Sequence, residues 1–144
     1  EAAGDALTYG LDTNAVSLLM KGDANVIAHL KRVGRGDVRI PQPVVSEIAY
    51  GIQRLVKSKR KELLAHRFAL VRDEIARAVW TDEVSEAFGR IKATLERKGE
   101  RIEDFDAAVA AHAVAEGCTL VTANLKHMTR VPGLDVEDWS RNVG

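Results

Sequence analysis

The sequence contains little cysteine, few aromatic residues, no excess of either charge and no long apolar run. Its 144 residues include one cysteine, Cys118, so no intrachain disulfide can form and we expect a reduced, cytoplasmic protein. Lys and Arg number 21, as do Asp and Glu, so a nucleic acid would have to be held by a local patch. Aromatic residues make up 5%, too few for a base-stacking platform. No apolar run approaches the roughly 18 residues of a membrane helix, and we expect no membrane contact.

The remaining composition is that of one globular domain. With 46% hydrophobic and 29% charged residues, the chain has enough apolar surface for a single core. Residues 1–8, EAAGDALT, lack an initiator methionine and are typical of a tag or a disordered leader. We therefore expect a single domain over residues 9–144.

Short apolar runs alternate with amphipathic stretches along the chain. Period-3.6 apolar spacing, proline near a first turn and glycine at helix ends predict helices. The predicted helices cover residues 14–21, 24–33, 43–55, 63–71, 82–98 and 104–116, and the predicted strands cover 8–11, 38–40, 78–80 and 118–122. This alternation predicts an α/β domain with a small, mostly parallel central sheet and helices on both faces.

The first unusual acid is Asp12, which ends the first predicted strand in the stretch YGLDTNAVSLLM. In parallel sheets, ligands bind outside the carboxyl ends of the strands, so this is a favourable place for a functional carboxylate. Asp12, Thr13 and Asn14 are also preferred helix caps. Capping alone explains this tripeptide equally well, although only one of the three residues is needed for it.

A second acid, Glu47, falls inside an apolar stripe. It lies between Val44 and Ile48 on the predicted helix 43–55, so its carboxylate is expected to point toward the core side. An ordinary explanation is a Glu at the edge of the stripe that pairs with Arg54.

A third acid, Asp106, shares a helix face with Val109, Ala110 and Ala113, which should pack inward. Acids in a first turn are favoured by the helix dipole, so the cluster EDFD needs no function by itself. Glu103 and Asp104 can lie at a solvated cap, whereas Asp106 cannot.

Three carboxylates turned inward without Lys or Arg partners would raise one another's pKa. A divalent ion relieves this conflict, and oxygen ligands without Cys or paired His favour Mg²⁺ or Mn²⁺ over structural zinc. Such an ion can activate water and stabilise the charge of a phosphodiester displacement.

Four motifs, in order, resemble one known family. They are LDTN at 11–14, SEIAYG at 46–51, GRIKATLERKG at 89–99 and the long segment from Asp106 to Trp139. The chain resembles PIN-domain ribonucleases, and most of all the VapC toxins of bacterial type II toxin–antitoxin systems. The resemblance implies a three-layer α/β/α sandwich and a Mg²⁺-dependent endoribonuclease that cleaves phosphodiester bonds of cellular RNA.

Carried over by position, the resemblance makes Asp12, Glu47 and Asp106 the catalytic acids that hold the metal. It assigns the polar surround that orients them to Thr13, Asn14, Thr122 and Asn124. His127 stands where many relatives have an acid, which bears on whether one metal or two are bound. Simple variation at a loop tip explains His127 as well.

The resemblance also implies partners. A cognate VapB-type antitoxin is expected to dock over the acidic pocket and to carry the complex to operator DNA, and a homodimer is expected through the helices near residues 44–71. RNA or partner contacts are expected at Lys57, Lys59, Arg60 and Arg130, although a charged run is equally often a solvated hairpin tip. Two other functions stay open: a non-catalytic PIN-like regulatory module, and a metal-dependent nuclease acting on DNA or a phosphatase.

Overall fold

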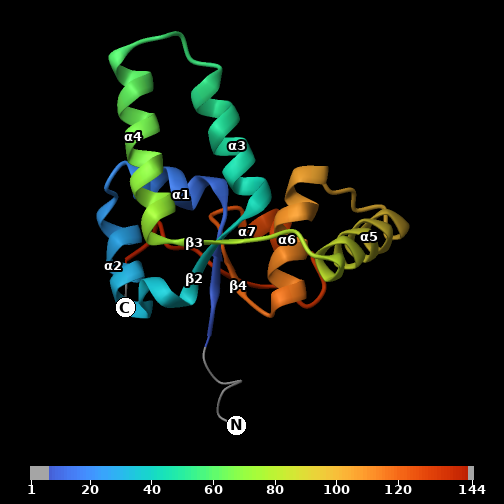
Figure 1. Ribbon diagram of the computed structural model, residues 1–144. Helices are drawn as coiled ribbons and strands as arrows, with labels where there is room; N and C mark the ends of the chain where they lie inside the picture. Colours follow the sequence, from blue (N-terminus) through green and yellow to red (C-terminus); the bar gives the residue numbers. More distant parts are fainter. Residues whose placement is uncertain (1–6, 143–144) are drawn as a thin grey trace.

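The computed structural model describes residues 7–142, which form a central five-stranded sheet flanked by helices (Figure 1). All neighbouring strands are parallel, in the order β3-β2-β1-β4-β5. The strands are β1 Tyr9–Leu11, β2 Val38–Pro41, β3 Ala76–Ala78, β4 Thr119–Val121 and β5 Asp135–Glu137. The predicted parallel α/β sheet is confirmed.

Within residues 7–142, seven α-helices connect the strands, with one short 3-10 turn at Arg35–Asp37. They are α1 Thr13–Met20, α2 Ala24–Val33, α3 Gln42–Gln53, α4 Lys59–Glu74, α5 Asp82–Arg97, α6 Asp104–Glu116 and α7 Leu125–Met128. The third strand lies two residues earlier than predicted. Part of the basic run predicted as a connection forms the first turn of α4, because Ser58 caps that helix by accepting a hydrogen bond from Lys61 N–H (3.1 Å).

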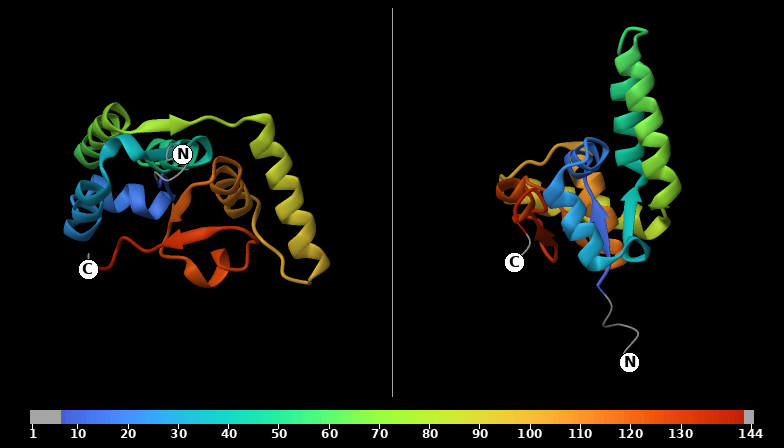
Figure 2. Two further views of the ribbon diagram at one scale, coloured as in Figure 1. Left: turned by 90° about the horizontal axis from the view of Figure 1, so that it is seen from below. Right: turned by 90° about the vertical axis from the view of Figure 1, so that its left-hand side faces the viewer.

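The chain crosses the sheet in two directions. From β1 the chain passes through α1 and α2 to β2, and then through α3 and α4 to β3, so each new strand lies farther from β1. It then returns through α5 and α6 and adds β4 on the other side of β1. Because such crossovers are right-handed, opposite directions place helices on opposite faces. Figure 2 (left) shows α1 and α2 on one side of the sheet and α5 and α6 on the other, which confirms the three layers.

The core lies on both faces of the three middle strands. Leu11, Ile40 and Leu120 are fully buried there, as expected for parallel strands covered on both sides. Trp139 is buried at the sheet edge, where its ring stacks on His29 with centroids 5.4 Å apart. The packing of these buried residues fixes the positions of the strand ends, and therefore the positions of the side chains that directly follow the strands.

Helices α3 and α4 form an antiparallel pair that projects beyond the body of the domain (Figures 1 and 2). We call this pair, residues 42–74, the arm. It leaves the sheet at the carboxyl ends of the strands, because α3 follows β2 directly.

Two expectations concern the ends and the surface. The segment predicted as a tag or disordered leader falls mainly on residues 1–6, outside the described residues, whereas Thr8 already belongs to the fold and accepts a hydrogen bond from Thr119 N–H (2.9 Å). No helix in the described part of the chain is long and apolar enough to cross a membrane.

Candidate active site

The strand order reverses beside β1, between β1 and β4, and the expected residues gather at the carboxyl ends of these strands. Leu11 is in register with Val121, so the next residues, Asp12 and Thr122, come side by side. Asp12 N–H donates to the Val121 carbonyl (3.1 Å), which extends the ladder to the site. A crevice at such a switch point is where open α/β sheets bind ligands.

Asp12 both faces this crevice and caps a helix. Its Oδ1 accepts a hydrogen bond from Ala15 N–H (2.8 Å), so Asp12 is the N-cap of α1. Of the three possible caps it is therefore Asp12 that caps the helix, while Thr13 and Asn14 form its first turn. The side-chain geometry of a cap needs extended backbone, and Asp12 has it because it continues β1.

The hydroxyl of Thr13 has no hydrogen-bond partner within residues 7–142, although its Oγ1 is buried. Asn14 is exposed. A buried hydroxyl without a partner is costly, and Thr13 lies beside the carboxylates. It is therefore available to a group that enters the crevice.

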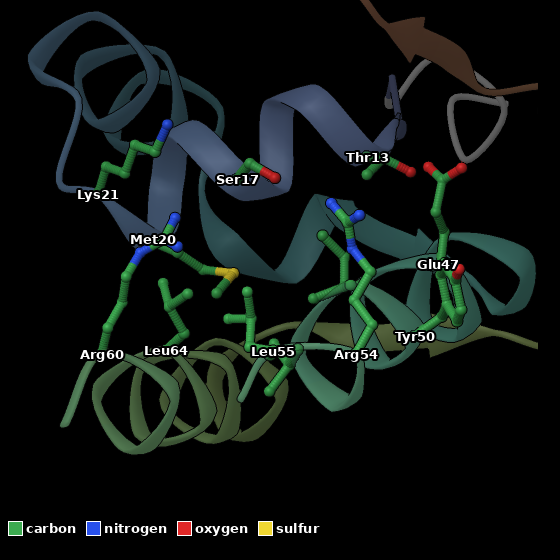
Figure 3. Close-up of a pocket in the computed structure, with 13 residues that line it drawn as sticks. Thr13, Ser17, Met20, Lys21, Glu47, Tyr50, Arg54, Leu55, Arg60 and Leu64 are labelled. Carbon is green, nitrogen blue, oxygen red and sulfur yellow. The ribbon is translucent and has the colours of Figure 1, made fainter. Parts of the chain in front are cut away.

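Glu47 reaches the site from α3, but it is exposed, and the expectation that it points to the core side is wrong. Helix α3 starts at the carboxyl end of β2 and runs away from the sheet. The inner face of its second turn, where Glu47 lies, therefore borders a cavity instead of packed side chains. Figure 3 shows the Glu47 carboxylate turned toward Thr13. No ion pair of Glu47 is present among the described residues, so pairing with Arg54 does not explain it.

Asp106 lies in the first turn of α6 and is half-buried, as its helix face predicts. Its neighbours are exposed: Asp104 pairs with Lys92 (Nζ–Oδ1 2.5 Å), and Glu103 occupies the N-cap without a side-chain hydrogen bond. The cluster thus divides as expected between two solvated acids and one inward acid.

One cavity of about 230 Å³, which we call the acid cavity, brings together the three expected acids and the four residues of their expected polar surround. Its carboxylates are Asp12, Glu47 and Asp106. Its other polar lining residues are Thr13, Asn14, Thr122 and Asn124. Thr122 is held in place by Asn124 N–H, which donates to its Oγ1 (3.0 Å).

The two inner carboxylates have raised pKa values. Burial is the main cause for Asp12, with a smaller contribution from the charge of Asp106, while hydrogen bonds from Thr122 and Ala15 act in the opposite direction. Burial also raises the pKa of Asp106, and so do the charges of Glu103 and Glu47. Both acids are therefore costly to ionise in the protein alone, which is what a nearby cation reverses.

The chemistry of the lining suits a hard cation, since carboxylate, hydroxyl and amide oxygens surround the cavity and no thiolate does. Across residues 7–142, however, no three His, Cys, Asp or Glu side chains are close enough to hold an ion among themselves. Mg²⁺ commonly binds through one or two carboxylates and keeps several waters, so the two observations are compatible.

One further acid near the site is not among the expected residues. Asp138 lies close enough to raise the pKa of Asp12 by its charge. Its own pKa is lowered, since hydrogen bonds from Ser140 and the charge of Arg141 outweigh the effect of burial. Asp138 directly follows β5, so the rule that singled out Asp12 could have found it once that strand was predicted.

The basic residues fall into two groups. Lys57, Lys59 and Arg60 lie near the tip of the arm, and of these only Arg60 lines a cavity that reaches the site. Arg130 and His127 lie next to the site, because both line a groove together with Asp106.

A larger cavity of about 620 Å³ runs between α1, α3 and α4 and adjoins the acids (Figure 3). We call it the arm groove. Its apolar lining includes Met20, Leu55 and Leu64, and its rim carries Lys21, Arg54 and Arg60. Thr13 and Glu47 line both cavities, so an occupant of the arm groove reaches the acids.

Comparisons with known proteins agree with this geometry. A family profile described as PIN domain matches residues 9–134. Ribonuclease VapC2 of Rickettsia felis is 30% identical over 137 residues, covering 94% of this chain and all of the relative. The tRNA(fMet)-specific endonuclease VapC of Salmonella typhimurium is 29% identical, covering 92% and 98%.

Solved structures give the same result. The structure of VapBC2 from R. felis bound to a DNA fragment from its promoter contains a chain that superposes with a TM-score of 0.84 at 28% identity, covering 92% of this chain and 99% of that one. DNA-bound VapBC from S. typhimurium gives 0.80 at 25% identity, covering 92% and 98%.

Proposed function

Because the chain belongs to the PIN-domain family, and its relatives there are VapC ribonucleases, we propose that it is an endoribonuclease toxin neutralised by a VapB-type antitoxin. The observation that carries the proposal is the single cavity at the switch point, which gathers all three acids and their polar surround. A non-catalytic module has no need of two half-buried carboxylates with raised pKa values.

We propose Mg²⁺ or Mn²⁺ as the cofactor. Asp12 and Asp106 would hold it, with Glu47 contributing directly or through water. A bound ion supplies an activated water and positive charge beside the scissile phosphate. Support comes from the carboxylate, hydroxyl and amide oxygens that the polar lining residues supply, and from the cost of ionising the two inner acids without a cation.

The protein's own residues supply position. The cap hydrogen bond from Ala15 N–H and the Thr122 hydroxyl fix the Asp12 carboxylate, and Asn124 fixes Thr122 in turn. The Thr13 hydroxyl, which has no partner in the part of the chain that the structure describes, can donate to a phosphate oxygen or to a water in the cavity. These contacts reduce the reorganisation needed when substrate enters.

The antitoxin is proposed to occupy the arm groove, with acidic side chains against its basic rim and apolar ones on its floor. Because this groove is continuous with the acids through Glu47, a bound segment blocks the cavity. The R. felis and S. typhimurium complexes contain DNA, and we propose that here too the antitoxin carries the pair to its operator. The cytoplasmic setting stays a prediction.

The function is tested by RNA cleavage. With Mg²⁺ or Mn²⁺, the wild type is expected to cut RNA at defined sites, and initiator tRNA is the first substrate to try because of the S. typhimurium relative. Asp12→Asn and Asp106→Asn each remove a metal-holding charge and are expected to reduce kcat/KM by at least about 10²-fold, as does EDTA. Sequencing of RNA 5′ ends after brief induction identifies the cut sites in cells.

Arg90→Gln is the control, since this exposed arginine of α5 lines none of the cavities described above. Both Asn variants are checked for folding by circular dichroism. Cleavage and growth inhibition that survive either Asn substitution contradict the nuclease assignment. Preferential cutting of DNA would favour the DNA nuclease, and release of phosphate from monoesters would favour the phosphatase.

A further inference from the structure

On the side away from the arm groove, the acid cavity continues into a second groove. This groove lies between α5, the connection before α6, and the segment that follows β4. This groove encloses about 850 Å³, and it shares Phe105, Asp106 and Asn124 with the acid cavity. We call it the α5–α7 groove. The acids therefore lie between two grooves, with the arm groove on one side and the α5–α7 groove on the other.

Arg130 is fixed in this groove by the backbone. Its Nε donates to the His127 carbonyl (3.0 Å), and its Nη1 donates to the Arg101 carbonyl (3.1 Å). Its Nη2 has no acceptor among residues 7–142. A guanidinium held by two carbonyls loses little side-chain entropy when a further oxygen binds to it.

The groove carries both charges. Its carboxylates are Glu96, Glu103, Asp104 and Asp106. Of its basic side chains, Lys92 is paired with Asp104, whereas neither Arg101 nor Arg130 has an ion-pair partner in the described part of the chain. The pKa of Asp106 is raised by burial and by the charges of Glu103 and Glu47, and the charges of His127 and Arg130 act in the opposite direction. The groove thus offers free cationic donors at the end nearest the acids.

The two grooves differ in what they can recognise. The arm groove has an apolar floor, which suits a protein segment, while the α5–α7 groove is lined mainly by charged and amide side chains. An RNA backbone presents phosphate oxygens and gains little from an apolar floor. Guanidinium groups bind phosphate oxygens by strong, directed hydrogen bonds.

We propose that the α5–α7 groove holds the RNA strand on one side of the scissile bond, with Arg130 binding the adjacent phosphate and Arg101 supporting it. This inference rests on the proposed function. It assigns the two sides of the acid cavity to different partners, RNA in the α5–α7 groove and antitoxin in the arm groove. Arg130 is thereby a substrate-binding residue, separate from the acids that hold the metal.

The test measures RNA binding without cleavage. In an Asp12→Asn background, a fluorescent RNA oligonucleotide spanning the cut site of the wild type is titrated at several NaCl concentrations. Arg130→Gln is expected to weaken binding about tenfold and to reduce the slope of log K against log salt by about one, because one phosphate contact is lost. Arg130→Lys keeps the charge and should keep most of the slope. Arg90→Gln is the matched control, an exposed arginine of α5 outside the groove.

A purely structural role of Arg130 would lower stability but leave the salt slope unchanged. Arg101→Gln separates the two roles, because the Arg101 side chain makes no hydrogen bond within residues 7–142, and its loss is expected to reduce the slope without lowering the melting temperature. The inference is overturned if both variants bind with the affinity and slope of Arg90→Gln while the wild type cleaves RNA. If the wild type cleaves no RNA, the proposed function fails first and this inference with it.

Discussion

His112 is a buried histidine whose two ring nitrogens lack hydrogen-bond partners among the described residues. It packs edge-on against Trp80, with ring centroids 5.5 Å apart, on the inner side of α6. Burial lowers the pKa of His112 from its ordinary value of 6.5. The folded protein therefore resists protonation of this ring more than the unfolded chain does.

The sign of the resulting pH dependence follows directly. The stability that neutral His112 provides is fully present above pH 6.5, and it is lost as the pH falls from there toward the lowered pKa of the folded state. The loss is at most about 1.4 kcal/mol per pH unit. Between pH 6.5 and 5 we expect the free energy of unfolding to fall more steeply with decreasing pH in the wild type than in His112→Leu, as measured by urea denaturation. Parallel pH curves for the two proteins would contradict this.

Among single residues, the site was predictable where an acid stands in an apolar pattern. Asp12 was found because it directly follows a buried strand, and Asp106 because it shares a helix face with alanines. The exposure of Glu47 was not predictable, since helical spacing gives the face of a side chain but not where the neighbouring layer ends. The unpartnered Thr13 hydroxyl and the backbone clamp on Arg130 depend on segments far apart in the sequence, which no local pattern reports.

Helices were predicted best where their ends carry a signal. The bounds of α2 and α6 were correct, because Gly34 and Gly117 stop the two helices, Asp23 caps α2, and acids occupy the first turn of α6. The strand Ala76–Ala78 was misplaced by two residues, since two of its three residues are exposed and it carries no apolar signal. The apolar pair Val79–Trp80 after it resembles a strand more closely but remains largely exposed.

The arm groove, built by α1, α3 and α4, carries a prediction about neutralisation. Leu64 is a half-buried floor residue on α4, so Leu64→Asp would place a charge beneath any apolar segment that docks there. Burying an unpaired charge costs several kcal/mol, so we expect the affinity for the cognate VapB to fall by at least about tenfold. RNA cleavage with increasing VapB measures the effect.

Val56→Asp is the control for this experiment, because Val56 is exposed at the tip of the arm and does not line the groove. Cleavage by each variant without VapB is measured beside it, so that a folding defect is recognised. If the VapB concentration that fully inhibits the wild type also fully inhibits Leu64→Asp, the antitoxin binds outside the arm groove.

At the scale of the whole molecule, the arm leaves apolar side chains in solvent. Leu63 and Leu70, one heptad apart on α4, are 46% and 49% exposed, and Tyr50 on α3 is 69% exposed. Apolar side chains exposed along a projecting helix are typical of an interaction surface. The homodimer expected through residues 44–71 stays a prediction, and we place it on the face of α4 that carries Leu63 and Leu70.

Two apolar surfaces compete for that role, because Val79 and Trp80 are also exposed, beyond the end of β3. The arm is favoured since its apolar residues repeat along one helix face, which can meet its own symmetry mate over several turns. Leu63→Glu with Leu70→Glu is therefore expected to convert a particle of twice 15.7 kDa into one of 15.7 kDa in sedimentation equilibrium. The charges face water in the monomer, so its melting temperature should change little. If Val79→Glu dissociates the dimer and the double arm variant does not, the two-fold axis lies beside β3, and the arms point away from each other.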